Sequence, residues 1–143
     1  MKLYYRDITR FKYQVTLTYK HQTDILKCEA SAPLIYLDND GLLTVFGGYL
    51  WDGASGPTLD TKSSMRGSLT HDVFYELFRR GKLEQKYRPY ADQLLHDICV
   101  EDGMNPIRAD IWETMVNKFA ASAARFGTQP EDTVICVGKE VGP

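Results

Sequence analysis

The spacing of apolar residues changes partway along the chain, and this change limits the folds available to it. From Phe11 to Tyr19, apolar and aromatic residues hold the odd positions, while Lys, Gln and Thr hold the even ones. Such alternation predicts a β-strand with one buried and one exposed face. From Ser64, apolar residues instead recur every four positions as far as Leu77, which predicts an amphipathic helix. We therefore expect an α+β domain, with a small antiparallel sheet followed by a three-helix subdomain.

The chain has 143 residues, a length that fits a single domain with a substantial core. We expect residues 1–50 to be mainly β and residues 51–63 to form a glycine-rich loop. Residues 64–127 are predicted to be helical, and residues 128–143 to form a tail. Within the tail, Thr133–Val137 is a candidate short strand that returns to the sheet.

Turn residues divide the predicted β region. A second strand is expected over Ile25–Ala30, with Pro33 ending it. Two apolar runs, Leu34–Leu37 and Leu42–Phe46, then flank the Asp-Asn-Asp-Gly sequence at residues 38–41. Because Asn, Asp and Gly tolerate positive φ, this arrangement predicts a β-hairpin.

Capping and stop residues delimit the three predicted helices. Ser63 or Ser64 is expected to cap the first helix and Gly81 to end it. The second helix is expected to open at Pro89 and Tyr90 and to end at Gly103.

The third helix is expected to start with Asn105 as its N-cap and Pro106 in its first position, and to end at Gly127. An apolar stripe on this helix is predicted to face the core. Its members are Ile107, Ile111, Met115 and Phe119.

The composition excludes several classes of protein. A net charge of −2 gives no overall basic field, so nucleic acid is not an expected partner. The apolar runs are too short for a transmembrane segment. The N-terminus lacks the apolar core of a signal peptide, so export by that route is not expected. Three cysteines without a Cys-x-x-Cys pair predict reduced thiols rather than a disulfide framework.

Candidate catalytic residues lie on the first two predicted helices. His71 and Tyr75 are four positions apart and share a helix face. If the two helices pack antiparallel, His71 can meet Asp92, and a carboxylate on one imidazole nitrogen raises the basicity of the other. Tyr75 can add a hydrogen bond to the same carboxylate. The alternative is a structural network that holds the two helices in register.

Two metal sites are also consistent with the residue types. Asp52 and Asp72, with backbone carbonyls of the glycine-rich loop, would give the all-oxygen shell that calcium prefers. The loop can equally be a tight connection whose polar side chains cap backbone amides. A zinc alternative would use four side chains of the two helices. They are His71, Asp92, His96 and Cys99.

Three motifs occur in a fixed order: Asp-Gly-Ala-Ser-x-Pro at residues 52–57, His-Asp-x-x-Tyr at 71–75 and Ala-Asp at 91–92. Together they resemble a small domain family of unknown function from phages and bacteria, over roughly Leu34 to Gly127. Trp51 stands where that family usually has threonine, and Gly56 where it has valine. The resemblance implies a phage or prophage origin and association with virion or tail proteins. It implies synthesis in the host cytoplasm, with incorporation into the virion as a further expectation.

The same helices are similar to the histidine–aspartate helices of phospholipase A2, over about 45 residues. That resemblance implies a calcium-dependent hydrolase of phospholipid esters, although the disulfides that join the helices in that family are missing here. It implies that His71 is the base, Asp92 its orienting partner and Tyr75 a support for Asp92. It also implies a calcium ion held by four positions. These are Asp72, Asp52 and the backbone of Gly53 and Gly56.

Two hypotheses follow from the sequence. The first is a calcium-dependent lipid-ester hydrolase that uses His71, Asp92 and a water molecule. The second is a non-enzymatic structural or interaction component of a phage virion or tail, in which the histidine–aspartate network is structural.

Overall fold

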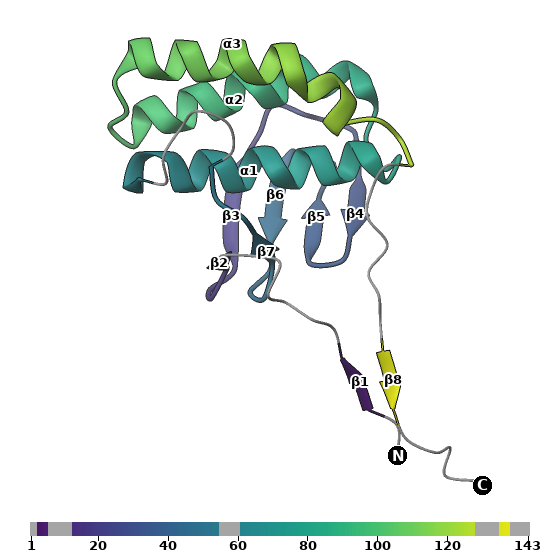
Figure 1. The fold of residues 1–143 in the computed structure, drawn as a ribbon. Helices are drawn as coiled ribbons and strands as arrows, with labels where there is room; N and C mark the ends of the chain where they lie inside the picture. The colour runs from purple at the N-terminus through teal and green to yellow at the C-terminus, as the bar shows by residue number, and fades with distance from the viewer. Residues whose placement is uncertain (1–2, 6–12, 55–60, 128–134, 138–143) are drawn as a thin grey trace, which may run out of the picture.

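The structure is a computed structural model that describes residues 3–5, 13–54, 61–127 and 135–137. In this part of the chain, three helices form layers above short antiparallel strands, with α1 next to the strands (Figure 1). The α+β class predicted from the sequence is therefore confirmed.

The strands within the described residues form one four-stranded and two two-stranded sheets, all antiparallel. The larger sheet has the order β3-β6-β5-β4, and the small sheets pair β2 with β7 and β1 with β8. The bounds are β1 Leu3–Tyr5, β2 Tyr13–Gln14, β3 Tyr19–Gln22, β4 Ala30–Ala32, β5 Ile35–Leu37, β6 Leu42–Val45, β7 Leu50–Trp51 and β8 Ile135–Val137.

The hairpin predicted at residues 38–41 is confirmed by β5 and β6. The Asp38 carboxylate accepts hydrogen bonds from the backbone N–H groups of Asp40 and Leu42, each at 2.9 Å. Gly41 has φ +85°, and a Cβ added there would lie 2.5 Å from the Thr23 carbonyl oxygen. Glycine is therefore required for both conformation and space.

The continuous strand predicted from Phe11 to Tyr19 is wrong within the described residues. The chain pairs with β7 only to Gln14 and with β6 only from Tyr19. Between these segments the side chain of Leu17 is 82% exposed. The alternation is interrupted because the chain changes its pairing partner, which local spacing does not encode.

The second strand predicted at Ile25–Ala30 is also wrong, because only Ala30 belongs to a strand. Lys27 has φ +57°, and its N–H donates to the Asn39 carbonyl at 2.8 Å. Ile25 is nevertheless 2% exposed, so this segment buries an apolar side chain from a loop.

The third helix begins as predicted, and the first begins slightly earlier than predicted. Helix α1 spans Lys62–Arg79 with Thr61 as its N-cap, and the Thr61 N–H donates to Ser64 Oγ at 2.9 Å. Ser64 is thus the capping-box partner rather than the cap itself. Helix α3 spans Pro106–Ala123, and the Asn105 side chain accepts from the Ile107 N–H at 2.9 Å.

Helix α2 spans Arg88–Glu101, with Pro89 in its first turn as predicted. A single 3₁₀ turn, η1 at Gln85–Tyr87, precedes it. The predicted end at Gly103 agrees with its φ of +99° just beyond the helix.

The apolar stripe predicted for α3 is wrong. Ile107 and Ile111 are 70% and 57% exposed, whereas Ala109 and Trp112 are buried. Ala109 and Trp112 belong to a small apolar cluster with residues of α2, including Leu95. The face that α3 buries is set by its packing on α2 rather than by its most hydrophobic side chains. The side chain of Phe119 lies outside the described residues.

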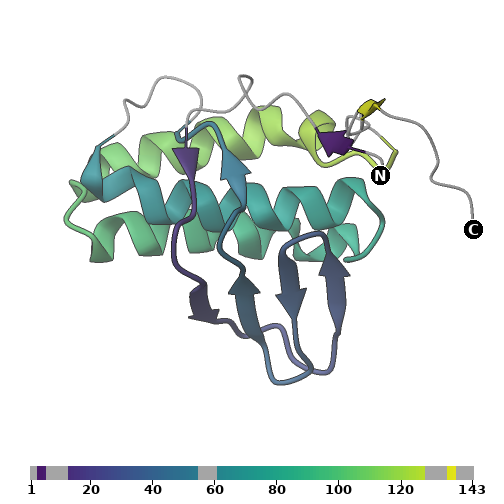
Figure 2. The same cartoon turned by 90° about the horizontal axis from the view of Figure 1, so that it is seen from below.

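The main core lies between α1 and the strands, and Figure 2, seen from below, shows the four-stranded sheet beside α1 and extending past it. Buried side chains of α1 pack against those of β5 and β6, and each contributes roughly 1.5–3 kcal/mol through burial. They include Val73, Phe74, Leu77, Phe78, Leu37, Leu43 and Val45.

A glycine lets α1 and α2 approach closely. A Cβ added at Gly67 would lie 2.6 Å from Cys99 Sγ and 3.1 Å from the Leu95 carbonyl oxygen. Ser64, Thr70 and His71 are also buried, so α1 buries polar side chains as well as apolar ones.

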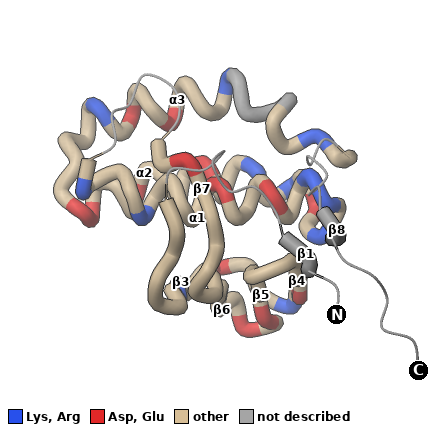
Figure 3. The backbone as a smooth tube through the Cα atoms, turned by 60° about the horizontal axis from the view of Figure 1, so that its bottom comes forward, with Lys and Arg blue, Asp and Glu red and all other residues tan. Residues whose placement is uncertain are grey.

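The candidate strand Thr133–Val137 is partly present as β8, and residues 133–134 lie outside the described part. It pairs with β1, an element that was not predicted, instead of joining the main sheet. Among the described helices, none has the length and apolar character needed to cross a bilayer. Lys and Arg positions interleave with Asp and Glu along the helices (Figure 3).

Candidate functional site

His71 of α1 and Asp92 of α2 meet where the two helices pack together. His71 Nε2 lies 2.8 Å from Asp92 Oδ1. His71 is 9% exposed and Asp92 2% exposed. The short connection through η1 turns the chain back on itself, so the pairing expected from helix spacing is present.

Tyr75 bonds to the same carboxylate oxygen. Its hydroxyl donates to Asp92 Oδ1 at 2.7 Å. The rings of His71 and Tyr75, one helical turn apart, stack with centroids 4.2 Å apart and planes at 29°. The imidazole is therefore held both by the carboxylate and by the ring of Tyr75.

The hydrogen bond to Asp92 determines which imidazole nitrogen can accept a proton. An ionised carboxylate only accepts, so Nε2 carries the hydrogen and Nδ1 of neutral His71 keeps its lone pair. His71 Nδ1 lies 3.9 Å from Asp72 Oδ1, and the Asp72 side chain is 37% exposed. The basic nitrogen thus faces a more exposed carboxylate on its own helix.

Burial and neighbouring carboxylates act in opposite directions on His71. Burial lowers the pKa of His71, but hydrogen bonding and charge from Asp72 and Asp92 outweigh it and raise the pKa above its usual value. Burial, followed by the bond to Asp92, raises the pKa of Tyr75. Tyr75 therefore stays protonated and remains a donor to Asp92.

The glycine-rich loop begins beside α1. Trp51 Nε1 donates to Ser68 Oγ at 3.4 Å, one turn before His71. Asp52 is exposed, and Gly53 is buried with φ +82°. Gly56 lies outside the described residues. The calcium set of Asp52, Asp72 and the backbone of Gly53 and Gly56 therefore stays a prediction.

The zinc alternative is wrong for the described side chains. Asp92 turns toward His71 and Tyr75, while His96 turns toward Asp97 and Asp110. Cys99 is buried beside Gly67, and its burial raises the thiol pKa to about 12. Within the described residues, these four side chains do not form a group that could hold one metal ion.

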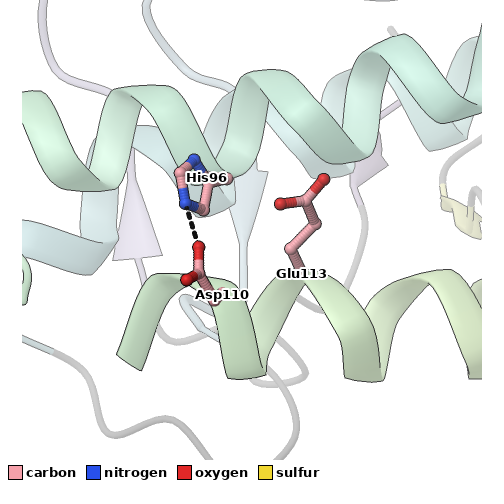
Figure 4. A group of neighbouring side chains, drawn as sticks. All are labelled: His96, Asp110 and Glu113. Carbon is pink, nitrogen blue, oxygen red and sulfur yellow. Dashed lines mark hydrogen bonds and ion pairs between the residues drawn. The ribbon is translucent and has the colours of Figure 1, made fainter. Parts of the chain in front are cut away.

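A second cluster was not predicted. His96 Nε2 lies 2.6 Å from Asp110 Oδ1, and Glu113 points toward the same space from the next turn of α3 (Figure 4). The zinc ligands predicted from the sequence include His96 but neither Asp110 nor Glu113. Their separation of three positions, which places two carboxylates on one helix face, is the signal that could have revealed them.

A scan of protein-family models finds no matching family, and searches of curated proteins and of solved structures find no match.

Proposed function

We propose that the chain is a hydrolase in which His71 activates water. The observation that carries this proposal is the 2.8 Å contact between His71 Nε2 and Asp92 Oδ1, which leaves Nδ1 as the basic nitrogen. A histidine oriented by a carboxylate is a common general base for attack by water. Tyr75 supports Asp92 through the same oxygen.

The proton balance of the reaction is simple. His71 Nδ1 accepts a proton from water as the water oxygen attacks the ester carbonyl carbon. The C–O bond to the alcohol then breaks, and Nδ1 returns the proton to the departing oxygen. Asp92 stays ionised throughout and stabilises the imidazolium that forms between the two steps.

Asp72 is the candidate anchor for a calcium ion. Its carboxylate is partly exposed and lies beside the basic nitrogen, which fits a hard cation that prefers oxygen ligands. Asp52 and carbonyls of Gly53 and Gly56 would complete the ligand set. Bound calcium would supply Lewis-acid stabilisation of the oxyanion. A phospholipid ester as substrate rests on the resemblance to phospholipase A2.

The test is release of fatty acid from mixed phospholipid vesicles with calcium. Wild-type protein should release it, and His71→Gln should lose at least about 100-fold, the range that a general base supplies. His96→Gln is the matched control. It removes a histidine of α2 that lies outside the proposed hydrolytic site, so full activity is expected. The hydrolase proposal fails if wild type and His71→Gln both release nothing.

Calcium binding is tested separately by thermal unfolding. Calcium should raise the melting temperature of wild type and of Asp97→Asn, but not of Asp72→Asn. Equal stabilisation of all three proteins would remove Asp72 from the ligand set while leaving the base proposal intact.

A non-enzymatic role is the second candidate, and the burial of the network favours it. With His71 at 9% and Asp92 at 2% exposure, the contact can serve to hold α1 on α2. The chain would then be a structural component of a phage virion or tail. Incorporation of His71→Gln into particles at the wild-type level, with no lipid hydrolysis by either protein, is the result expected for this role.

A further inference from the structure

The cluster around His96 brings ligands from two helices together. His96 extends from α2, while Asp110 and Glu113 extend from successive turns of α3 into the same space (Figure 4). One ligand atom from each of the three residues lies within 4.8 Å of the other two. Within the described residues this is the one such group of three His, Cys, Asp or Glu side chains.

The cluster carries more negative charge than the imidazole neutralises. No Lys or Arg of the described residues forms an ion pair with Asp97, Asp110 or Glu113. The Glu113 carboxylate has no hydrogen-bond partner among those residues either. A bound cation would balance this charge.

The ring of His96 is already oriented for a ligand at Nε2. Its Nδ1 lies 3.0 Å from Asp97 Oδ1, and that oxygen also accepts from Gln93 Nε2 at 2.9 Å. An ionised Asp97 fixes the hydrogen on Nδ1 and leaves Nε2 facing α3. Metal-binding histidines usually hold their other nitrogen against a carboxylate in this way.

We propose that His96 Nε2 and the carboxylates of Asp110 and Glu113 bind a divalent first-row transition-metal ion that bridges α2 and α3. Imidazole suits zinc and its neighbours in the transition series, whereas a site for calcium or magnesium would be built from oxygen alone. Metal–ligand distances of about 2.0–2.2 Å require the three groups to draw closer. The Asp110 side chain is 67% exposed and has room to do so. Three protein ligands leave further coordination positions open to water.

This site is separate from the proposed hydrolytic site, since it uses none of His71, Asp72 or Asp92. The competing explanation is a surface ion pair in which protonated His96 is held between Asp97 and Asp110. The two explanations differ in one measurable property, namely whether a metal ion binds at this position with defined stoichiometry.

The location of binding can be tested with Mn²⁺, which broadens NMR signals of nearby nuclei. Substoichiometric Mn²⁺ added to chelator-treated full-length protein should broaden backbone amide signals of residues 94–98 and 109–114 first. Absence of broadening at residues 94–98 and 109–114 would overturn the assignment to α2 and α3, whatever happens at residues 52–54 and 72. Broadening without saturation would overturn a defined site.

Affinity is measured by calorimetric titration with Zn²⁺. The wild type should bind one ion at this site. Asp110→Asn and Glu113→Gln each remove a ligand and should weaken binding by 100-fold or more. Asp97→Asn removes the partner of His96 Nδ1 and should weaken binding by about 10–100-fold. The control Glu84→Gln removes a carboxylate that is 70% exposed and lies outside the cluster, and should change nothing. Asp72→Asn should also change nothing, so that failure of this proposal and failure of the hydrolase proposal remain distinct. Equal affinity of wild type, Asp110→Asn and Glu113→Gln would overturn the proposal.

Discussion

The two histidine–aspartate pairs of this chain use the same contacts in opposite surroundings. In each, Nε2 contacts an aspartate on the following helix: His71 reaches Asp92 at 2.8 Å, and His96 reaches Asp110 at 2.6 Å. In each, Nδ1 faces the aspartate that follows in the sequence, at 3.9 Å for His71 and 3.0 Å for His96. Both pairs therefore join successive helices.

Exposure separates the two pairs. The Asp92 side chain is 2% exposed and that of Asp110 is 67% exposed. Water screens the surface pair and can replace its partners, whereas the buried pair has no substitute for a lost partner. The buried pair is suited to fixing the orientation of a base. The surface pair is suited to metal binding, in which His96 Nε2 would bind a metal ion in place of a proton.

The largest expected effect comes from removing the buried carboxylate. Asp92→Ala leaves both His71 and Tyr75 without their partner and should lower the free energy of unfolding by about 3–5 kcal/mol. The matched change Asp110→Ala in the surface pair should cost at most about 1 kcal/mol. Urea unfolding of both variants measures the difference. Equal losses would contradict the division into a buried and an exposed pair.

The hydroxyl of Tyr75 provides a milder change in the buried network. Tyr75→Phe removes one donor to Asp92 and should cost roughly 1.5–3 kcal/mol, the usual range for a hydrogen bond to a charged group. Tyr36 donates to Glu29 Oε1 at 3.0 Å on the surface, so Tyr36→Phe is the control and should leave stability unchanged. Urea unfolding of the two variants tests this. An equal loss in the free energy of unfolding for Tyr36→Phe and Tyr75→Phe would show that the buried hydroxyl contributes no more than the exposed one.

The pH dependence of stability should also distinguish the pairs. Burial lowers the pKa of His71 in the folded state, but Asp72 and Asp92 outweigh it and raise the pKa above its usual value. Folded protein then binds more protons than unfolded protein above pH ~6.5, so stability falls as pH rises through the folded pKa. The fall should be largely absent in His71→Gln. His96→Gln should reduce it only slightly, because water screens the charges around His96. Unfolding free energies measured across this range in chelator-containing buffer give the comparison.

The buried pair could be predicted from the sequence because each of its requirements is local. Residues four apart share a helix face, and a short connection forces two helices to pack antiparallel. His71 and Asp92 follow from these two facts. The surface pair depends on where α3 crosses α2, and the sequence suggested a different orientation. The exposed Ile107 and Ile111 led to the wrong face of α3.

Adjacent residues of one helix are in contact at the surface pair. Successive helical side chains diverge by about 100°, which argues against direct contact between adjacent residues. Yet His96 Nδ1 lies 3.0 Å from Asp97 Oδ1, because a long imidazole and a rotatable carboxylate can lean toward each other. The strands between Phe11 and Ala30 were mispredicted for another reason. Their pairing partners change along the chain, and such long-range pairing leaves no local pattern.

The smallest expected effect is the salt dependence of the surface pair. His96→Gln, measured without metal, should lower the free energy of unfolding by about 0–1 kcal/mol at low ionic strength. At 1 M salt, where the screening length falls to about 3 Å, this difference should vanish. The cost of Asp92→Ala should persist, since the Asp92 side chain is only 2% exposed and is little screened by salt. Urea unfolding of each variant at two salt concentrations measures both. A His96→Gln effect that survives high salt would mean that His96 contributes through packing rather than through charge, and the contrast between the two pairs would then be one of degree.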